Sequence, residues 1–561
     1  MHTEEKIITA QSLFKELKNY SVYEFFRVNS EQYGTEYAAF QHYGRDHKKS
    51  EFINDIEALS YYYQNDLGFK AGDVYTIFMP TSVEAMIIFM ALNKIGVIVN
   101  FVHPLLPPEN VKEIMEETNS KGIAALDLLL KDHIGMLAQK GLPCMITMGA
   151  TYAVPDKFSV KPHEGIKAAL DAYVKNYAVY NEIIAKYSGN VSVPFENNEN
   201  GIAVYMNGGG TTGKSRTIKL SNAAINNVVN MCCMINRRLE EPGIDTEIAS
   251  MPFFHAYGFC VGGLSGLHKA SKMVFLPKFD ADTFIEILKR EKVSEFNGVP
   301  NAFKKLYAHP EFDGPFLKNI RAMFCGGDNL HKSFLKEFRA VLRKNGCTAD
   351  IYQGYGLTEC GAICTVNPVW ANKEGTIGKP LPGNTIEIWD DNDNNLPTGE
   401  IGEVVISGPT MMEGYLTQDG PIDDGVYKDA NGKKWIKTGD LAHYDEDGYL
   451  HFVGRKKRVI IISGYNVYPG DIEFLMNELP FIRECCAVQG IQDDKIIVRL
   501  YVAADNLEGN EEAYKEQITQ LCAERLSKFS VPRDIRFIDA LPRTRIEKVD
   551  FMSLTEFPST K

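Results

Sequence analysis

The sequence lacks any long uninterrupted apolar run. Its most apolar region, residues 83–102, is broken by Glu84, Asn93 and Lys94, whereas a membrane-spanning helix needs about 20 consecutive apolar residues. A buried helix followed by a strand therefore fits this region better than a membrane span. The first residues also lack the basic and then apolar layout of a secretory signal peptide. We therefore expect a cytoplasmic protein with no membrane span.

The sequence is also relatively poor in positive charge. It has 60 Lys and Arg residues against 73 Asp and Glu residues, for a formal net charge of −13. Because binding to a nucleic-acid phosphate backbone requires clustered basic surface, this balance argues against nucleic acid as a partner. It still allows an anionic small molecule to bind in a local basic pocket.

The cysteines do not have the spacing of a zinc site. The 11 cysteines are scattered, and Cys360 and Cys364 form the one pair whose spacing suggests a metal. No second pair completes a four-ligand site. We expect buried free thiols, as is usual in a reducing cytoplasm.

The length and pattern of the chain predict an α/β protein with more than one core. With 561 residues, 44% hydrophobic and 24% charged, the chain has the composition of a globular protein and is too long for one domain. The first half alternates strand and helix signals, as α/β folds do. The clearest are a strand at 73–78, a helix at 82–95 and a strand at 97–102.

The second half changes character twice. Residues 374–454 have short strand patterns punctuated by glycine and aspartate turns, and a basic run follows at 455–458. We place the domain boundary there, which gives an N-terminal domain of residues 1–456 and a small C-terminal α/β unit of residues 457–561.

A glycine-rich loop at residues 208–215 reads Gly-Gly-Gly-Thr-Thr-Gly-Lys-Ser. It matches the phosphate-binding loop of P-loop nucleotidases, in which a helix must start at the lysine so that its N-terminus faces the phosphates. Here residues 201–206 and residues 216–221 both have strand patterns. The sequence thus predicts a hairpin whose loop holds a triphosphate. A P-loop enzyme that hydrolyses ATP to ADP stays as an alternative.

Six further segments give this loop a context. In chain order they are residues 252–258 (Pro-Phe-Phe-His-Ala-Tyr-Gly), 325–328 (Cys-Gly-Gly-Asp), 354–359 (Gly-Tyr-Gly-Leu-Thr-Glu), 435–441 (Trp-Ile-Lys-Thr-Gly-Asp-Leu), 454–455 (Gly-Arg) and 541–550 (Leu-Pro-Arg-Thr-Arg-Ile-Glu-Lys-Val-Asp). Together they resemble the acyl-CoA synthetase branch of the adenylate-forming, AMP-binding enzymes. The resemblance runs from about residue 52 to residue 554, and it rests on the ordered set rather than on any one segment.

The resemblance implies a fold and an activity. The fold would be a large N-terminal domain of α/β layers with a small β-barrel-like subdomain, followed by a small mobile α+β C-terminal domain. The activity would be ATP-dependent conversion of a fatty or aromatic carboxylic acid into an acyl-adenylate, then thioester formation with coenzyme A. AMP and pyrophosphate would be released. ATP, Mg²⁺ and coenzyme A are the implied substrates and cofactor, and the enzyme would be an acid–thiol ligase.

The resemblance also implies catalytic roles. His255 would lie beside the substrate carboxylate, and histidine where peptide-synthetase adenylation domains carry aspartate favours an acid without an α-ammonium group. Thr358 would bond the α-phosphate and Glu359 would hold magnesium, since one carboxylate with phosphate oxygens is a common magnesium site. Lys548 would be the mobile catalytic cation.

The implied binding residues fall into four groups. Tyr355 would stack on adenine, and Asp440 would accept hydrogen bonds from both ribose hydroxyls. The full set comprises residues for the phosphates (Gly210, Thr211, Thr212, Gly213, Lys214, Arg216), for adenine (Gly326, Gly327, Asp328, Gly354, Tyr355, Gly356), for the nucleotide sugar (Asp440, Arg455) and for the pantetheine arm of coenzyme A (Ser463, Gly464, Tyr465).

Several positions depart from the family pattern. Arg216 replaces a lysine and so keeps the charge but changes the donor geometry. Arg458 stands at the hinge position usually taken by Asp or Lys, and Glu547 replaces the glycine beside Lys548. Two alternatives stay open: an acyl-AMP ligase that serves a carrier protein, and a non-catalytic adenylate-binding protein. The matching segment Gly414–Tyr415 is interpreted as scaffold.

Overall fold

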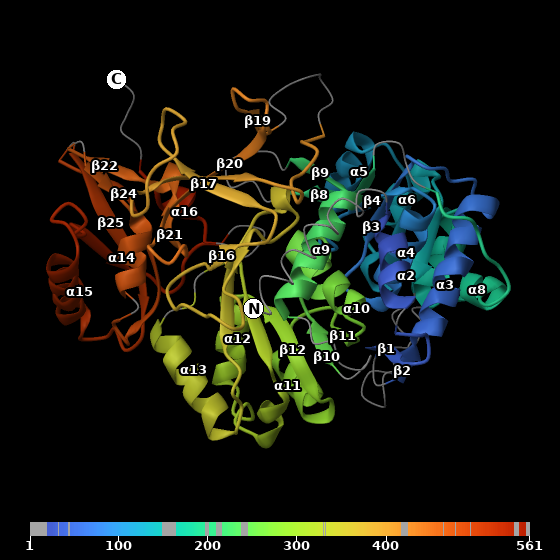
Figure 1. Ribbon diagram of the computed structural model, residues 1–561, viewed down its shortest axis with the longest axis horizontal. Coiled ribbons are helices and arrows are strands. Elements are labelled where there is room, and N and C mark those ends of the chain that lie inside the picture. The colour runs from blue at the N-terminus through green and yellow to red at the C-terminus, as the bar shows by residue number, and fades with distance from the viewer. Residues whose placement is uncertain are drawn as a thin grey trace.

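The structure is a computed structural model of the 561-residue chain. It describes residues 20–556 apart from residues 32, 43–44, 148–163, 197–200, 209–215, 237–244, 329, 331, 417–424, 464, 477, 494 and 544–548. Figure 1 shows the chain running from the N-terminal α/β half, through a central region, to a C-terminal region that is orange to red.

The N-terminal half is built on a seven-stranded sheet of order β7-β6-β5-β3-β4-β8-β9. Its strands are β3 (Val74–Phe78), β4 (Ile98–Phe101), β5 (Ser120–Leu126), β6 (Cys144–Thr147), β7 (Tyr177–Val179), β8 (Ile202–Asn207) and β9 (Thr217–Ser221). All neighbours are parallel except β8 and β9, which form an antiparallel hairpin. The helices of this half are α3 (Lys49–Tyr61), α4 (Val83–Lys94), α5 (Pro108–Glu117), α6 (Ile134–Lys140), α7 (Glu164–Tyr173) and α8 (Tyr180–Tyr187).

Helix α4 explains the apolar region of the sequence. Its first turn is capped by the Ser82 hydroxyl, which accepts a hydrogen bond from the backbone N–H of Ala85 at 3.2 Å. All of its residues are buried, including Glu84, and Gly96 with φ 73° turns the chain into β4. The predicted strand, helix and strand are confirmed. In the part of the chain that the structure describes, no helix has the length and apolar character to cross a membrane.

The second sheet has nine strands in the order β16-β15-β14-β13-β12-β10-β11-β1-β2. They are β1 (Ala38–His42), β2 (Arg45–Lys48), β10 (Thr246–Ala249), β11 (Lys272–Phe275), β12 (Val293–Gly298), β13 (Ala322–Cys325), β14 (Ile351–Tyr355), β15 (Thr365–Val366) and β16 (Lys379–Pro380). From β1 to β14 the neighbours are parallel, and the strands at both edges are antiparallel. Helices α11 (Ala281–Arg290), α12 (Pro300–Ala308) and α13 (Lys332–Lys344) belong to this half.

A layer of helices joins the two sheets. Helix α2 (Val22–Glu31) contacts α4, α9 (Asn222–Asn236) and α10 (Ser265–His268), and α9 contacts the π-helical segment η4 (Tyr257–Leu264). Figure 1 shows α9 and α10 in the middle of the molecule, between the blue half and the strands β10 to β12. One hydrophobic core includes residues from both sheets and from these helices, so the two sheets form one packed unit.

A third sheet follows in chain order. Its strands are β17 (Thr385–Trp389), β18 (Gly402–Ser407), β19 (Tyr427–Lys428), β20 (Lys434–Tyr444) and β21 (Leu450–Arg455), and all their pairings are antiparallel. The order is β17-β18-β20-β19, with β21 also on β20. Among the strands described, no hydrogen-bonded pairing joins the two edges of this sheet into a closed barrel. The predicted barrel-like subdomain is therefore an open sheet.

The C-terminal region has its own hydrophobic core. After the short turn η7 (Lys456–Arg458) come the hairpin β22 (Ile460–Ile462) and β23 (Tyr465–Val467), helix α14 (Pro469–Met476), strands β24 (Ile482–Gln492) and β25 (Lys495–Ala504), helix α15 (Glu511–Arg525), strand β26 (Asp534–Phe537) and helix α16 (Phe551–Leu554). Strands β24, β25 and β26 form one sheet. The predicted small α+β region is confirmed, and the boundary at residues 456 and 457 stays a prediction.

The cysteines agree with the sequence analysis. All 11 are free thiols and most are buried, and burial raises the pKa of the Cys144 thiol to about 12. No group of three or more His, Cys, Asp or Glu side chains with metal-binding geometry occurs in the described residues.

Candidate active site

The glycine-rich loop is carried by the β8–β9 hairpin. Asn207 pairs with Thr217 across the hairpin, and the backbone N–H of Gly208 donates to the carbonyl oxygen of Arg216 at 2.9 Å. Strand β9 begins at Thr217, and helix α9 starts only at Asn222. From Arg216, where the described chain resumes, it continues as a strand and not as a helix, so the hairpin prediction is confirmed. Residues 209–215, which include the predicted phosphate ligands Gly210, Thr211, Thr212, Gly213 and Lys214, lie outside the described residues.

The other edge of β9 is covered by residues 413–416. The backbone N–H of Lys219 donates to the carbonyl of Gly414 at 3.0 Å, and that of Leu416 donates to the carbonyl of Thr217 at 2.7 Å. This pairing brings Tyr415 to the hairpin. The Tyr415 hydroxyl donates to Oε1 of Glu359 at 3.0 Å. The centre of its ring lies 4.9 Å from the Arg216 guanidinium carbon.

Tyr415 is therefore a residue that the sequence analysis placed in the scaffold and that the structure places at the site. Burial and the nearby Glu359 carboxylate raise the pKa of its hydroxyl, so it stays protonated and able to donate. The sequence did contain one indication of this role: Tyr415 follows Gly414 in a segment that resembles the family.

Glu359 is held where the chain leaves strand β14. The turn η6 (Thr358–Cys360) follows the strand, and the carbonyl of Glu359 accepts the backbone N–H of Met412 at 2.7 Å. A Cβ at Gly356 would lie 1.9 Å from the carbonyl oxygen of Ala362, so only glycine fits there. Gly361, with φ 69°, helps to turn the chain back.

The Glu359 carboxylate fits the predicted magnesium role. Within the described residues it makes no ion pair, and Tyr415 is the side chain that donates to it. A carboxylate that is oriented by a neutral donor keeps its charge and its remaining lone pairs for a cation. Among the described residues Glu359 belongs to no group of three or more potential metal ligands, which suits a magnesium ion that is held mainly by substrate phosphates.

Tyr355, Asp440 and Arg455 form one cluster. Asp440 on β20 and Arg455 on β21 are directly paired in register. The Arg455 Nε lies 2.8 Å from Oδ1 of Asp440, and the Tyr355 hydroxyl donates to Oδ2 at 2.8 Å. Burial, and then the Asp440 charge, raise the pKa of the Tyr355 hydroxyl well above its usual value. The structure thus brings Tyr355 to the pair of Asp440 and Arg455, although Asp440 lies 85 residues further along the chain.

The geometry of this cluster has a consequence for ribose binding. Asp440 is only 2% exposed; its Oδ2 accepts the Tyr355 hydroxyl, and its Oδ1 forms the ion pair with Arg455. Arg455, by contrast, has a side chain that is 54% exposed. A ribose can reach the carboxylate if Arg455 turns outward, because each carboxylate oxygen accepts more than one hydrogen bond.

His255 lies at the start of η4, at the carboxyl end of β10. Its backbone N–H donates to the carbonyl of Pro252 at 3.1 Å, and a Cβ at Gly258 would lie 2.1 Å from that same carbonyl oxygen. The chain therefore makes a tight turn here, and this turn requires the spacing of Pro252, His255 and Gly258. The His255 ring is partly exposed and contacts the ring of Phe254, with centroids 4.6 Å apart.

The same turn meets the predicted adenine segment. The Tyr257 hydroxyl donates to the carbonyl of Phe324 at 3.2 Å, and a Cβ at Gly326 would lie 3.5 Å from the Tyr257 ring. Gly327 has φ 85°, in the region that favours glycine, and Asp328 is exposed at the carboxyl end of β13. The site thus gathers at the carboxyl ends of β10, β13 and β14, the usual position for ligands of open α/β sheets.

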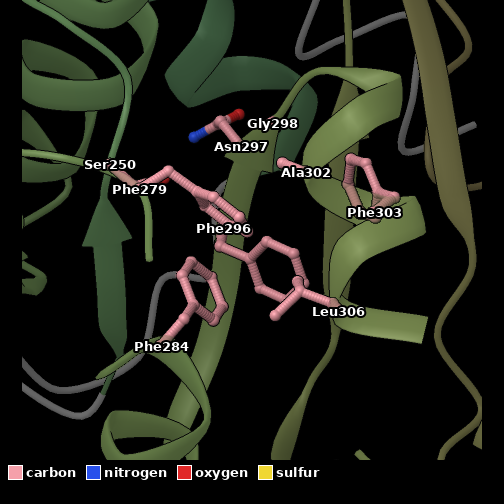
Figure 2. Close-up of a pocket in the computed structure, with 9 residues that line it drawn as sticks. All are labelled: Ser250, Phe279, Phe284, Phe296, Asn297, Gly298, Ala302, Phe303 and Leu306. Atoms are coloured by element: carbon pink, nitrogen blue, oxygen red, sulfur yellow. The ribbon is translucent and has the colours of Figure 1, made fainter. Parts of the chain in front are cut away.

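A small pocket lies nearby, between β12 and helices α11 and α12 (Figure 2). It is lined by Ser250, Phe279, Phe284, Phe296, Asn297, Gly298, Ala302, Phe303 and Leu306. The rings of Phe296 and Phe303 stack with centroids 5.6 Å apart and belong to a hydrophobic core. None of the catalytic or nucleotide-binding residues named above lines this pocket, and its aromatic rings belong to that core, so we interpret it as a packing space.

The predicted coenzyme A residues lie on the C-terminal hairpin. Ser463 has φ 53° in the turn between β22 and β23, and Gly464 lies outside the described residues. Tyr465 is 58% exposed and stacks on Phe529, with centroids 4.2 Å apart. An exposed aromatic surface is therefore present beside the predicted loop.

The predicted hinge and the predicted catalytic segment near the C-terminus are only partly described. Arg458 forms an ion pair with Glu473 and donates to the carbonyl of Ala487 at 3.2 Å. Arg543 and Val549 form an isolated bridge, and residues 544–548 between them, including the predicted catalytic Lys548, lie outside the described residues.

Comparison with known proteins supports the resemblance. The AMP-binding enzyme family matches residues 26–416, and the AMP-binding enzyme C-terminal domain matches residues 471–548. The chain is 26% identical over 520 residues to the long-chain-fatty-acid–CoA ligase of Bacillus subtilis (strain 168), which covers 91% of this chain and 90% of that protein. It is 30% identical over 356 residues to the 2-succinylbenzoate–CoA ligase of Bacillus licheniformis, which covers 62% of this chain and 68% of that protein.

A solved structure extends this to the fold. The ATP-bound MatB structure from Rhodopseudomonas palustris superposes with a TM-score of 0.76 at 21% identity, covering 95% of this chain and 98% of that one. The family match spans most of the chain and includes the segments at 208–215, 252–258, 325–328 and 354–359. The chain belongs to the AMP-binding enzyme family.

Proposed function

We propose that this enzyme uses ATP to activate a carboxylic acid as an acyl-adenylate and then transfers the acyl group to coenzyme A. AMP and pyrophosphate are the other products. The observation that carries the proposal is the position of segment 354–359. It contacts one residue that we propose for the ribose and lies beside another that we propose for the phosphates. Tyr355 bonds the Asp440 carboxylate, and Glu359 is bonded by Tyr415 beside Arg216.

The first half-reaction makes the acid reactive. A carboxylate is a poor electrophile because its leaving group would be oxide, whereas AMP departs readily from an acyl-adenylate. The carboxylate oxygen attacks the α-phosphorus of ATP, and the bond to the β,γ-pyrophosphate breaks. The chain must offset the repulsion between a carboxylate and a polyphosphate. The groups suited to this are the cations of Lys548, Lys214 and Arg216, and the metal ligand Glu359.

Each residue has a distinct task in this scheme. Glu359 would hold the magnesium ion, which when bound would neutralise charge on the phosphate oxygens. Thr358 would bond the α-phosphate, and Asp440 the ribose hydroxyls. His255 would lie beside the substrate carboxylate. A neutral or cationic ring there suits an acid that carries no α-ammonium group.

The second half-reaction needs a thiol to reach the adenylate. The hairpin turn at Ser463, with the exposed Tyr465 beside it, is suited to guide the pantetheine arm of coenzyme A. A rotation of the C-terminal region about residues 456–458 would remove Lys548 from the site and bring this turn to it, as in other enzymes that complete one site at a time. A fatty or aromatic acid is the substrate class that we propose.

The test is ATP consumption against short, long and aromatic carboxylic acids, with and without coenzyme A, resolving AMP from ADP. AMP that requires both an acid and coenzyme A supports the proposal and identifies the acid. AMP formation that is indifferent to coenzyme A would indicate another acceptor, such as a carrier protein. Nucleotide binding without AMP formation would indicate a binding protein.

A matched pair of variants makes this test specific. We expect Glu359→Gln to lower the rate of adenylation about 100- to 1,000-fold, the typical cost of losing one well-placed electrostatic group. Glu387→Gln is the control, because Glu387 accepts a hydrogen bond from Trp389 on the third sheet and contacts none of the proposed site residues. Equal activity of the two variants would contradict the role of Glu359.

A further inference from the structure

Tyr415 stands between two groups of opposite charge. Its hydroxyl donates to Oε1 of Glu359 at 3.0 Å, and the Arg216 guanidinium carbon lies 4.9 Å from the centre of its ring. These residues come from three separate segments: the strand that follows the glycine-rich loop, the turn after β14, and the segment that pairs with β9. No ion pair joins Arg216 directly to Glu359 in the described structure.

The backbone fixes the position of the Tyr415 ring. Tyr415 forms a bridge with Ile218 of β9, and its neighbours Gly414 and Leu416 hydrogen-bond to the same strand. Gly425, with φ 74°, approaches the ring so closely that a Cβ there would lie 2.4 Å from a ring carbon. Because the ring is held in this way, it can fix the positions of the Glu359 carboxylate and the Arg216 guanidinium.

The two contacts keep a cation and an anion apart. A guanidinium near a carboxylate tends to form a bidentate pair, and such a pair would neutralise Glu359 as a metal ligand. The Arg216 guanidinium lies instead against the Tyr415 ring and close to its hydroxyl, and the N–H donors of Arg216 that are not used there can bind other acceptors. The hydroxyl meanwhile occupies one lone pair of Glu359 and leaves the others open.

We propose that Tyr415 is a positioning residue that holds Glu359 and Arg216 in a fixed, separate arrangement, so that the carboxylate binds the metal and the guanidinium binds the outer phosphates of ATP. This rests on the proposed function. It also gives a physical reason for arginine at position 216, where the family prefers lysine. A planar guanidinium stacks on the tyrosine ring more fully than an ammonium does.

Three variants separate the two contacts. Tyr415→Phe removes the hydroxyl and keeps the ring, Tyr415→Leu removes both, and Arg216→Lys keeps the charge but not the plane. Tyr449→Phe is the matched control. The Tyr449 hydroxyl donates to the carbonyl of Ala371 at 2.7 Å, and Lys379 Nζ lies 4.5 Å from the centre of its ring.

The first measurement is metal binding, which does not depend on turnover. The full-length enzyme with a non-hydrolysable ATP analogue is titrated with Mn²⁺, and free Mn²⁺ is followed by electron paramagnetic resonance. We expect Tyr415→Phe to weaken Mn²⁺ binding about 10-fold or more, since loss of a residue that orients a metal ligand typically costs about 10- to 100-fold. Tyr449→Phe should bind like the wild type.

The second measurement is a double-mutant cycle on the KM for ATP at saturating metal. Tyr415→Phe should leave this KM near the wild-type value, whereas Tyr415→Leu and Arg216→Lys should each raise it. If the ring positions Arg216, the two changes combined should raise the KM by less than the product of their separate effects. If the KM of the double variant equals the product of the two separate effects, Tyr415 does not position Arg216, and that part of the proposal is overturned.

The outcomes also separate this inference from the proposed function. If the wild type makes no AMP from any acid, the activity is wrong, and the Mn²⁺ titration alone decides the role of Tyr415. Weaker binding in Tyr415→Phe than in Tyr449→Phe supports that role, and equal binding overturns it. A wild type that binds no Mn²⁺ with nucleotide would overturn both.

Discussion

Arg455 lies directly opposite Asp440 on neighbouring strands, with its Nε 2.8 Å from Oδ1 of that carboxylate. One of the two side chains is buried and the other is half exposed. The carboxylate is therefore fixed while the arginine can move. If Asp440 binds the ribose as proposed, Arg455 is the side chain that must turn away from it.

Asp440→Asn should weaken ATP binding with little effect on folding. Hydrogen bonds to a charged group contribute about 1.5–3 kcal/mol, so we expect kcat/KM for ATP to fall about 10- to 150-fold. Because Arg455 is exposed, it can turn to water and the stability should change by less than about 1 kcal/mol. Steady-state kinetics and thermal unfolding check the two parts. Asp505→Asn, which removes the partner of Arg483 in a surface ion pair, is the control and should leave the KM for ATP unchanged.

Gly356→Ala should damage the site through the backbone. The added Cβ would lie 1.9 Å from the carbonyl oxygen of Ala362, so the turn that carries Thr358 and Glu359 must shift. We expect a loss of about 1–3 kcal/mol in the free energy of unfolding and a fall in the adenylation rate of at least about tenfold. Denaturant titration measures the free energy of unfolding, and a pyrophosphate-release assay measures the adenylation rate.

Gly135→Ala provides the comparison for that variant. Gly135 lies in helix α6 and a Cβ there meets nothing within 4 Å. Alanine in a helix is favoured over glycine by about 0.5–1 kcal/mol, so this change should be neutral or slightly stabilising with full activity. An activity loss in Gly135→Ala as large as in Gly356→Ala would contradict the steric argument.

His268 should make the protein less stable in mild acid. Burial lowers the pKa of His268 from 6.5 to about 3, so the ring is neutral in the folded chain. The unfolded chain takes up a proton below about pH 6.5, and stability is therefore present above that pH and is lost as the pH falls towards 3. At pH 5 the loss should be about 2 kcal/mol relative to pH 7.5, at 1.36 kcal/mol per pKa unit.

The check for His268 is urea unfolding at the two pH values. His268→Phe keeps a ring beside Phe25, whose centroid lies 4.6 Å from the histidine ring. This variant should lack that part of the acid destabilisation. An unchanged pH dependence in His268→Phe would show that other groups cause it.

Lys548→Ala should separate the two half-reactions. If Lys548 acts only in adenylation, pyrophosphate release should fall about 100- to 1,000-fold, while thioester formation from a supplied acyl-adenylate should continue. Rapid-quench assays of each half-reaction measure this. Lys515→Ala is the control in the same region, because Lys515 forms an ion pair with Glu511 on helix α15 and lies outside the predicted segments. Equal loss in both half-reactions would contradict the assigned role.

Local signals explain why much of the fold could be predicted. The strand at β3, the Ser82 cap of α4 and the β8–β9 hairpin depend on neighbouring residues, and such features follow from side-chain pattern and turn chemistry. Glycines that the motifs require, such as Gly258 and Gly356, proved to sit against backbone oxygens. The family resemblance was confirmed by the family match over residues 26–416.

Contacts between distant segments could not be predicted in the same way. The third sheet was expected to be barrel-like, and its described strands form an open sheet. Tyr415 was interpreted as scaffold, because nothing near it in the sequence indicates that it bonds Glu359, which is 56 residues away. The Asp440 carboxylate was expected as a ribose ligand, but its contacts with Tyr355 and Arg455 depend on strand pairing.

The sequence alone determined the family and the order of the motifs, and it predicted the residues for the chemistry, because these follow from local composition and spacing. Only the tertiary structure decided which of those residues meet. It joined Tyr355 to Asp440 and Arg455, and it placed Tyr415 between Arg216 and Glu359. The physical reason is that strand register and sheet order fix side-chain neighbours across long stretches of chain, and no local pattern encodes that register.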